Sequence, residues 1–180
     1  GNKLLFAKNL NLNINQLKFD KETASEVIPV GYRSFQFSGK DILYSNHQNF
    51  SVGSIALNPK SGELRNISVT PNTNNPGKRA MNLKTNLVAF TINKFEFIDK
   101  KLNLDIKDVL VDHLNGTIKA GENKIRKAPK ENKVNSILVR KVSLKNSNIT
   151  YDKGNEPLVF NELNAIINDI DVQSKPNNHG

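Results

Sequence analysis

Three aspartates and a histidine stand close together near the middle of the chain, at Asp105, Asp108, Asp112 and His113. Carboxylate oxygens are the ligands that hard cations such as Ca²⁺ prefer, so this group is the first candidate for a metal site. In a strand, Asp108 and Asp112 would share a face while Asp105 would point the other way. No glycine-containing loop surrounds the group to wrap an ion. We therefore expect a solvated strand face and predict no metal site.

No set of residues typical of a catalytic site stands out. The chain has no cysteine, and it lacks the Gly-x-Ser-x-Gly sequence that presents an activated serine. His47 and His179 have no acid or nucleophile at a spacing typical of a known motif, so we expect both at the surface. Paired acids for glycoside hydrolysis meet only in the folded chain, and that alternative stays open. The prediction is a protein that is not an enzyme and needs no cofactor.

The chain is strongly basic, with a formal net charge of +9 at pH 7. Nucleic-acid binding would call for clustered Lys and Arg with aromatic residues interleaved for base stacking. The densest basic stretch, Lys124 to Lys133, contains no aromatic residue and is typical of a loop. We predict no nucleic-acid partner. Attraction to anionic lipid head groups is the other function that such a charge favours.

Apolar and polar residues alternate in several stretches, and helical spacing is rare. In the clearest stretch, Leu10, Leu12 and Ile14 are separated and flanked by asparagines, which places the three apolar residues on one face of a strand. Only 37% of the residues are hydrophobic and the mean hydropathy is −0.51, so one face of the sheet must be solvated. We expect an all-β fold: a curved, twisted, mainly antiparallel sheet, built as a repeating β-groove or an open sandwich, with at most one or two short helices.

The strand-like stretches fall into three blocks. Residues 1–71 form a first β-module, and residues 72–80 a linker, since Pro71 to Gly77 holds two prolines and no apolar residue. Residues 81–136 form a second module that ends in the long basic loop, and residues 137–180 form the third. Asp20 to Ile28 is a plausible short helix. Phe160 to Ile170 fits both helical and strand spacing, and we favour a strand.

Three turns and two irregularities are predicted within these blocks. Asn58 to Gly62 should close a hairpin that pairs Val52–Leu57 with Glu63–Thr70, with the glycine in the left-handed conformation. Asn115-Gly116 is the strongest two-residue hairpin signal, and Asp152 to Asn155 forms another turn. The apolar phase shifts by one residue in two places, which predicts β-bulges. These shifts lie between Ile14 and Leu17 and between Ile106 and Val109.

The third block carries a resemblance to a known family. Asn148-Ile149-Thr150-Tyr151-Asp152 is followed, after a polar turn, by Leu163-Asn164 with Ile167 and Ile170. This pattern resembles the repeat of bacterial AsmA-like proteins, and residues 50–64 resemble a looser version of it. The resemblance implies a periplasmic, membrane-anchored envelope protein of a Gram-negative bacterium, anchored through a segment that is not part of this sequence. It also implies a curved β-sheet with an apolar groove that carries or shields lipid acyl chains and so helps to maintain the outer membrane.

Two Phe-x-Phe pairs are the candidate ligand-binding residues. Phe35 and Phe37 form one pair, and Phe95 and Phe97 form the other. They are either ordinary residues of the sheet core or the wall of a groove that binds lipid or an apolar partner surface. The expected function is a non-enzymatic envelope module with an apolar binding face. The alternative is a structural or adhesive all-β interaction domain of a secreted or cell-surface protein.

Overall fold

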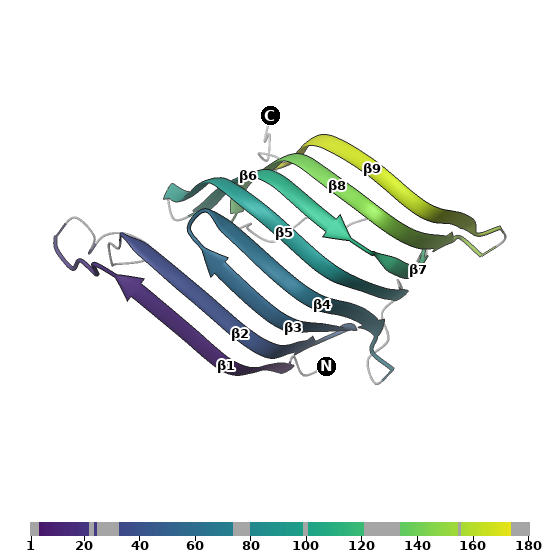
Figure 1. The fold of residues 1–180 in the computed structure, drawn as a ribbon, viewed down its shortest axis with the longest axis horizontal. Coiled ribbons are helices and arrows are strands. Elements are labelled where there is room, and N and C mark those ends of the chain that lie inside the picture. The colour runs from purple at the N-terminus through teal and green to yellow at the C-terminus, as the bar shows by residue number, and fades with distance from the viewer. Residues whose placement is uncertain are drawn as a thin grey trace, which may run out of the picture.

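The computed structural model describes residues 4–21, 24, 33–73, 80–98, 101–120, 134–154 and 156–173. Nearly all of these residues lie in strands (Figure 1). None of them belongs to a helix long and apolar enough to cross a membrane. The strands are β1 (Leu4–Asn15), β2 (Ser34–Ser45), β3 (Gln48–Asn58), β4 (Ser61–Pro71), β5 (Ala80–Ile98), β6 (Lys101–Asp112), β7 (Asn115–Lys119), β8 (Val134–Asp152) and β9 (Leu158–Gln173).

All nine strands belong to one sheet, in the order β1-β2-β3-β4-β5-β6-β8, with β9 on the outer side of β8. Strand β7 continues β6 in the same direction and lies between β5 and β8. The pairings are antiparallel except those of β8 with β6 and β7. The expected all-β, mainly antiparallel sheet is confirmed. The three blocks share this sheet, because β4 pairs with β5 on either side of residues 72–80 and β8 pairs with β6 and β7.

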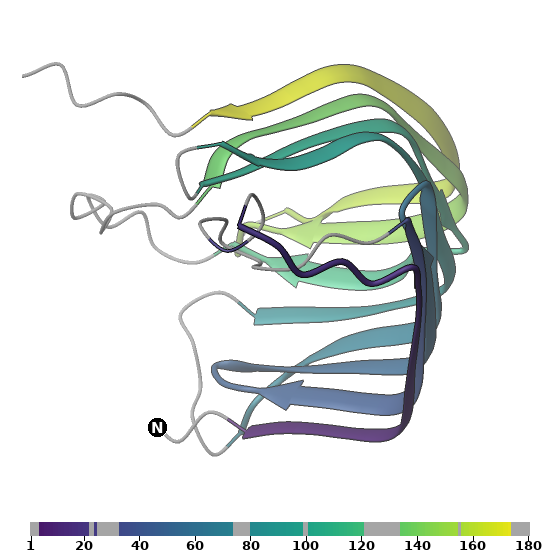
Figure 2. The same cartoon turned by 90° about the vertical axis from the view of Figure 1, so that its left-hand side faces the viewer.

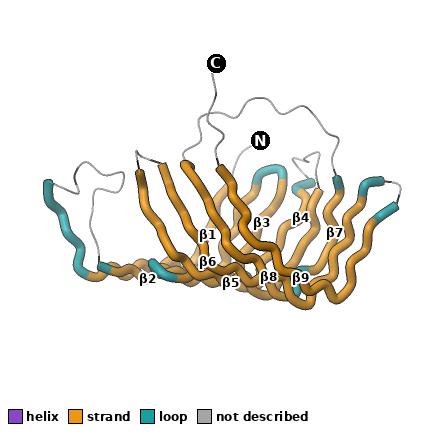
Figure 3. Tube along the Cα trace, turned by 90° about the horizontal axis from the view of Figure 1, so that it is seen from above, coloured by secondary structure: helices purple, strands orange, loops and turns teal. Residues whose placement is uncertain are grey.

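The sheet is strongly bent. Figures 2 and 3 show the strands turning at corners, so that both ends of the longer strands lie on the same side of the sheet. A flat pleated sheet would place these ends far apart, since each residue of a strand advances by about 3.3 Å. The backbone therefore has the shape of a trough, with the strands running across it.

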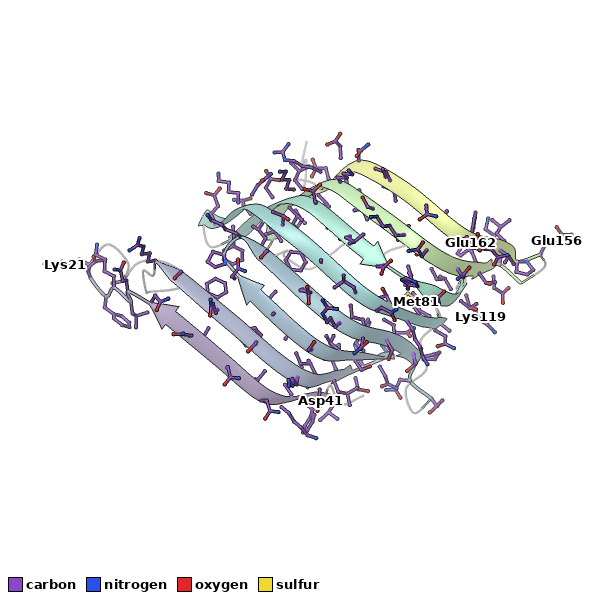
Figure 4. The ribbon with its side chains drawn as sticks, in the orientation of Figure 1. Lys21, Asp41, Met81, Lys119, Glu156 and Glu162 are labelled. Atoms are coloured by element: carbon purple, nitrogen blue, oxygen red, sulfur yellow. The ribbon has the colours of Figure 1, made fainter. Side chains whose placement is uncertain are left out.

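One line of backbone distortions crosses the sheet and accounts for a corner. Five strands, and the junction between β6 and β7, carry a non-glycine residue with φ between 49° and 55° in nearly equivalent positions. We call these residues the bend line: Asn9, Asp41, Asn66, His113, Asn146 and Glu162. Asp41 and Glu162 are labelled in Figure 4 and mark the bend line on β2 and β9. Asn, Asp and His adopt positive φ more readily than other non-glycine residues, which explains most of this line.

A left-handed residue changes which side chains share a face. In a regular strand, residues three apart point to opposite faces. At the bend on β2, however, a Cβ atom built on Gly39 would lie 3.5 Å from Cδ1 of Ile42. The two residues before and after the bend therefore converge on the same side. Each bend follows one local pattern: an inward residue, an outward residue, the left-handed residue and a second inward residue.

Exposure identifies the apolar face as the inner face of the bend. On β8, outward Lys145 and left-handed Asn146 are exposed, whereas Ser147, the next inward residue, is completely buried. On β4, Arg65 and Asn66 are exposed while Leu64 and Ile67 on either side are half-buried. Side chains on the inside of a corner are less exposed because neighbouring side chains crowd them there. The alternating apolar residues therefore line the concave face.

Polar side chains along the bend line satisfy backbone groups at the corner. The Leu114 amide donates to Ser147 Oγ (3.2 Å), and Ser147 Oγ donates to the carbonyl of Lys145 (2.9 Å). Thr85 Oγ1 donates to the Asp112 carbonyl (2.6 Å). The Asn146 amide donates to the side-chain oxygen of Asn164 (3.1 Å). Buried backbone groups need hydrogen-bond partners. At the corner the ladder of backbone hydrogen bonds is interrupted, and side chains provide the missing partners.

The predicted β3–β4 hairpin is confirmed. Asn58 and Ser61 are the last partners, and Asn58 Oδ1 accepts hydrogen bonds from the amides of Lys60 (2.8 Å) and Ser61 (3.0 Å). The role assigned to Gly62 was wrong, since its φ is not positive. Gly62 is required for space, because a Cβ atom there would lie 2.2 Å from Cζ of Phe90.

The predicted hairpin at Asn115-Gly116 is wrong. Asn115 pairs with Lys84 of β5 and with Asn148 of β8, so the chain continues in the direction of β6. The backbone bends at His113 (φ 55°), where the sheet turns its corner, without reversing the strand direction. Gly116 (φ 136°) is needed for close packing, since a Cβ atom there would lie 1.9 Å from the carbonyl oxygen of Asn82.

Of the remaining local predictions, some are confirmed, one is wrong and one lies mostly outside the described residues. Residues 160–170 form a strand, as expected, and Gly154 (φ 104°) lies in the predicted turn after β8, of which Asn155 lies outside the described residues. The register shift of β6 against β5 confirms the bulge between Ile106 and Val109. No bulge interrupts β1 between Ile14 and Leu17, because β1 ends at Asn15 and Gln16 (φ 53°) is a left-handed residue. Most of the predicted helix at 20–28 lies outside the described residues.

Replacing the left-handed Asn66 tests the origin of the bend. Asn66→Val should lower the free energy of unfolding by about 1–2 kcal/mol, because a β-branched residue is strained at positive φ. Asn66→Gly should be neutral within about 0.5 kcal/mol. Urea unfolding followed by circular dichroism measures both changes. Thr70→Val on the same strand is the control, and an Asn66→Val effect no larger than the control's would contradict the role of the bend line.

Candidate functional site

The concave face carries continuous rows of apolar side chains. Residues paired across adjacent strands share a face, so the strand register defines these rows. One row runs from edge to edge of the sheet, and we call it the floor row. It consists of Leu12, Phe37, Leu57, Gly62, Phe90, Val109, Val142 and Ile167. The adjacent row is equally apolar and consists of Ile55, Leu64, Val88, Val111, Leu144 and Ala165.

A further set of apolar residues lies beyond the bend line. Tyr44 pairs with Phe50, with ring centroids 6.0 Å apart, and Phe50 pairs with Val69. Val69 in turn pairs with Leu83 of β5. The apolar rows therefore continue from the floor of the trough onto one of its arms.

No described apolar side chain on this face is fully buried. Leu12 is 62% exposed, Ile167 47% and Phe95 45%. In most domains such a face packs against a second layer of structure. The described residues form a single sheet and supply no second layer. The concave face is thus an extended apolar surface that this part of the chain leaves open.

The four predicted phenylalanines occupy two places on the sheet. Phe37 belongs to the floor row, and Phe35 pairs with Ile14 beside it. Phe95 pairs with Leu104 near the other end of β5. Phe97 pairs with Leu102, and its side chain lies outside the described residues. Because β3 and β4 separate β2 from β5, the two pairs lie at least three strand spacings apart, more than about 14 Å, and do not form one cluster.

Phe90 is the aromatic residue that the sequence analysis missed. Its ring lies against Gly62, where a Cβ atom would approach Cζ to 2.2 Å. The register places it between Gly62 and Val109 in the middle of the floor row. Val88, Phe90 and Ile92 alternate with polar or small residues, so the signal was present in the sequence. Phe90 was overlooked because it stands outside the Phe-x-Phe pairs.

The outward face carries ion pairs in place of a metal cluster. Arg140 on β8 forms two hydrogen bonds to Asp105 on β6, Nε to Oδ1 (3.0 Å) and Nη2 to Oδ2 (2.7 Å). These hydrogen bonds from Arg140, opposed by partial burial, hold the pKa of Asp105 below its usual value. Asp108 is the register partner of Lys141, so a basic side chain lies beside it as well.

The second part of the aspartate group is also engaged. His113 Nδ1 lies 2.8 Å from Asp112 Oδ2, and Asn146 Nδ2 donates to Asp112 Oδ1 (3.3 Å). The hydrogen bond from His113 is the main cause of a lowered pKa at Asp112. The bulge after Ile106 shifts the alternation, which brings Asp105 to the outward face and corrects the expected arrangement. Within the described ranges, no three His, Asp or Glu residues are placed to hold a metal ion.

Further features concern the remaining histidines, the basic stretch and an open depression. His47 is exposed, as predicted, whereas His179 and residues 124–133 of the basic stretch fall outside the described ranges. An open depression between β2 and β6 is lined by small residues, including Ser38, Ala56 and Ala89, and also by Phe37, Leu57, Gly62 and Phe90 of the floor row. The expectation that the chain is not an enzyme stays a prediction.

Comparison with known proteins leaves the chain without an assigned family. No family model matches it, and neither a curated protein nor a solved structure is significantly similar to it.

Chelation tests the interpretation of the aspartate group. Treatment with EDTA should leave the melting temperature unchanged, because Asp105 and Asp112 already have protein partners. Differential scanning fluorimetry with and without added Ca²⁺ measures this. A shift of more than a few degrees in either sample would show that the group holds an ion.

Acidification tests the Asp105–Arg140 pair. Since the folded state lowers the pKa of Asp105, the pair stabilises the fold above the unfolded pKa of about 4. This contribution is lost as the pH falls through the folded pKa. Asp105→Asn should therefore lose less stability than the native chain between neutral pH and about pH 3, as measured by urea midpoints. The difference should be small because solvent screens this partly exposed pair, and equal losses would contradict it.

Proposed function

We propose that the concave face binds the acyl chains of lipids. The observation that carries this proposal is an apolar row that crosses eight strands while none of the described apolar side chains is fully buried. An apolar surface of this extent needs a cover of apolar chemistry. A lipid chain satisfies that need, because it is linear and offers no polar group that would require a partner.

The dimensions of the face support an acyl chain as the ligand. Eight strands spaced about 4.8 Å apart make the floor row about 34 Å long. The hydrocarbon of one lipid leaflet is about 15 Å deep, half of the bilayer core, so one or two extended acyl chains fit along the row. Gly62 and the ring of Phe90 lie near its middle. Aromatic and branched side chains on either side of the row would contact a chain lying along it.

The setting proposed for this activity is the bacterial envelope. The repeat in residues 137–171 that resembles AsmA-like proteins supports a periplasmic module, anchored through a segment outside this sequence, that contributes to outer-membrane maintenance. The net charge of +9 supports contact with anionic lipid head groups. In this proposal the concave face shields acyl chains from water and performs no covalent chemistry.

A structural or adhesive interaction domain is the second candidate. It is favoured by the exposed apolar residues on β1 and β9, which lie at the edges of the sheet and suit contact with another protein. In that case the concave face would be covered by a protein partner, and a free fatty acid would bind weakly or not at all.

Single charges on opposite faces of β2 test the proposal. Phe37→Asp should leave the circular dichroism spectrum unchanged, because the half-buried side chain faces an open surface. The same change should weaken binding of a fluorescent fatty acid about 10- to 100-fold, since a buried aromatic contact contributes about 1.5–3 kcal/mol. Gln36→Asp, next to it on the outward face, is the matched control and should bind like the native chain.

Two results would contradict lipid binding. One is the absence of fatty-acid binding by the native chain together with no co-purifying lipid in native mass spectrometry. The other is unfolding of Phe37→Asp, and likewise of Phe95→Asp and Leu57→Asp. Unfolding of all three would mean that protein covers this face as a closed core.

A further inference from the structure

The two edge strands share an unusual backbone pattern. Strands β1 and β9 form the edges of the sheet, and each has a neighbour on one side only. Each is associated with two left-handed residues seven positions apart, Asn9 and Gln16 for β1 and Glu162 and Asp169 for β9. Among the described strands, only these two carry such a pair of non-glycine residues. Both edges therefore turn two corners at the same spacing.

The sequences of the two edges match in the same register. Residues 5–16 and 158–169 align without gaps when the left-handed residues are superposed. Five of the twelve positions are identical, and the inward positions coincide throughout. The identical pairs are Leu5 and Leu158, Leu10 and Leu163, Asn11 and Asn164, Ile14 and Ile167, and Asn15 and Asn168.

Exposed apolar residues concentrate on these edges. Thirteen of the fifteen large hydrophobic side chains that are exposed among the described residues lie on β1, just after it, or on β9. Natural edge strands are usually kept from pairing by proline, inward charges or short length. Strands β1 and β9 are 12 and 16 residues long and contain no proline. Among the described side chains, the inward positions of both strands carry no charge.

The sheet already contains a pairing of the type that these edges allow. Strand β8 pairs in parallel with β6 and β7, and the paired strands bend at the same corner. Their outward residues are opposite in charge where they meet, as in Asp108 with Lys141 and Asp112 with Lys145. Parallel pairing of two strands with equal corner spacing is therefore compatible with this bent sheet.

We propose that β9 of one copy of the chain pairs in parallel with β1 of a second copy. The shared register would place Ala165 opposite Leu12 and Ile167 opposite Ile14, so that the apolar rows continue from copy to copy. Charge favours this pairing: Lys8 lies on the β1 edge, whereas Glu162, Asp169 and Asp171 lie on the β9 edge. Pairing of β9 with a second β9 would bring acidic residues together. The arrangement is head-to-tail and so extends beyond a dimer.

Disulfide cross-linking tests the register, because the native chain has no cysteine. One preparation carries Asn13→Cys and the other carries Ile166→Cys, both at exposed positions. The proposed register places these residues directly opposite, about 5 Å apart between Cα atoms, within the range of a disulfide. The mixture should form a covalent heterodimer under mild oxidation. Asn13→Cys mixed with Asn161→Cys is the matched control, five positions out of register, and should cross-link several-fold less.

Sedimentation of the unmodified chain gives an independent measurement. Its weight-average mass should rise with concentration past that of a dimer. The proposal is overturned if the native chain stays monomeric, if the control mixture cross-links equally well, or if Ile166→Cys cross-links alone as well as in the mixture. The inference goes beyond the proposed function and does not rest on it, since fatty-acid binding by a monomer and edge pairing are measured separately.

Discussion

A sheet can turn a sharp corner only if all of its strands turn at the same line. Left-handed residues on β1, β2, β4, β8 and β9, and at the junction of β6 and β7, provide that line. Asn, Asp and His tolerate this conformation better than other non-glycine residues, and the alignment of the bends keeps the hydrogen-bonded ladders intact on both sides of the corner. The trough, its concave apolar face and the crowding of Ser147 and Thr85 inside the corner all depend on this alignment.

The corner also explains why so polar a chain can form an extended apolar surface. At the bend, one inward residue lies on either side of two outward residues, so apolar side chains from the floor and from the adjoining arm converge on one side. Asparagines and charged residues occupy the outside of the corner, where Asn148 Nδ2 donates to Asn115 Oδ1 (2.8 Å) and Asn146 Nδ2 donates to Asp112 Oδ1 (3.3 Å). A single bent layer therefore needs few apolar residues per strand to line one continuous face.

The period-two alternation around Leu10, Leu12 and Ile14 was sufficient to predict the fold class, because alternation constrains each strand locally. The corners were visible only as phase shifts, and the one after Ile14 was interpreted as a bulge although Gln16 is left-handed. The signal at Asn115-Gly116 failed for a related reason. Residues that favour hairpin turns also favour positive φ, and only the pairing of β7 with β5 and β8 decides between turn and corner. The floor row was not predictable, since it depends on the register of strands far apart in sequence.

The corners and the edge strands together determine how the apolar rows could be extended. The corners fix the cross-section of the trough, whereas the number of strands fixes its length, because each added strand lengthens the floor row by about 4.8 Å. A ligand lying along the row would meet the same chemistry at every strand, which suits a repetitive hydrocarbon better than a compact molecule with distinct groups. Matching corners at the two edges allow added strands to preserve the cross-section. The bend line that makes the surface concave is thus also the feature that would make it extendable.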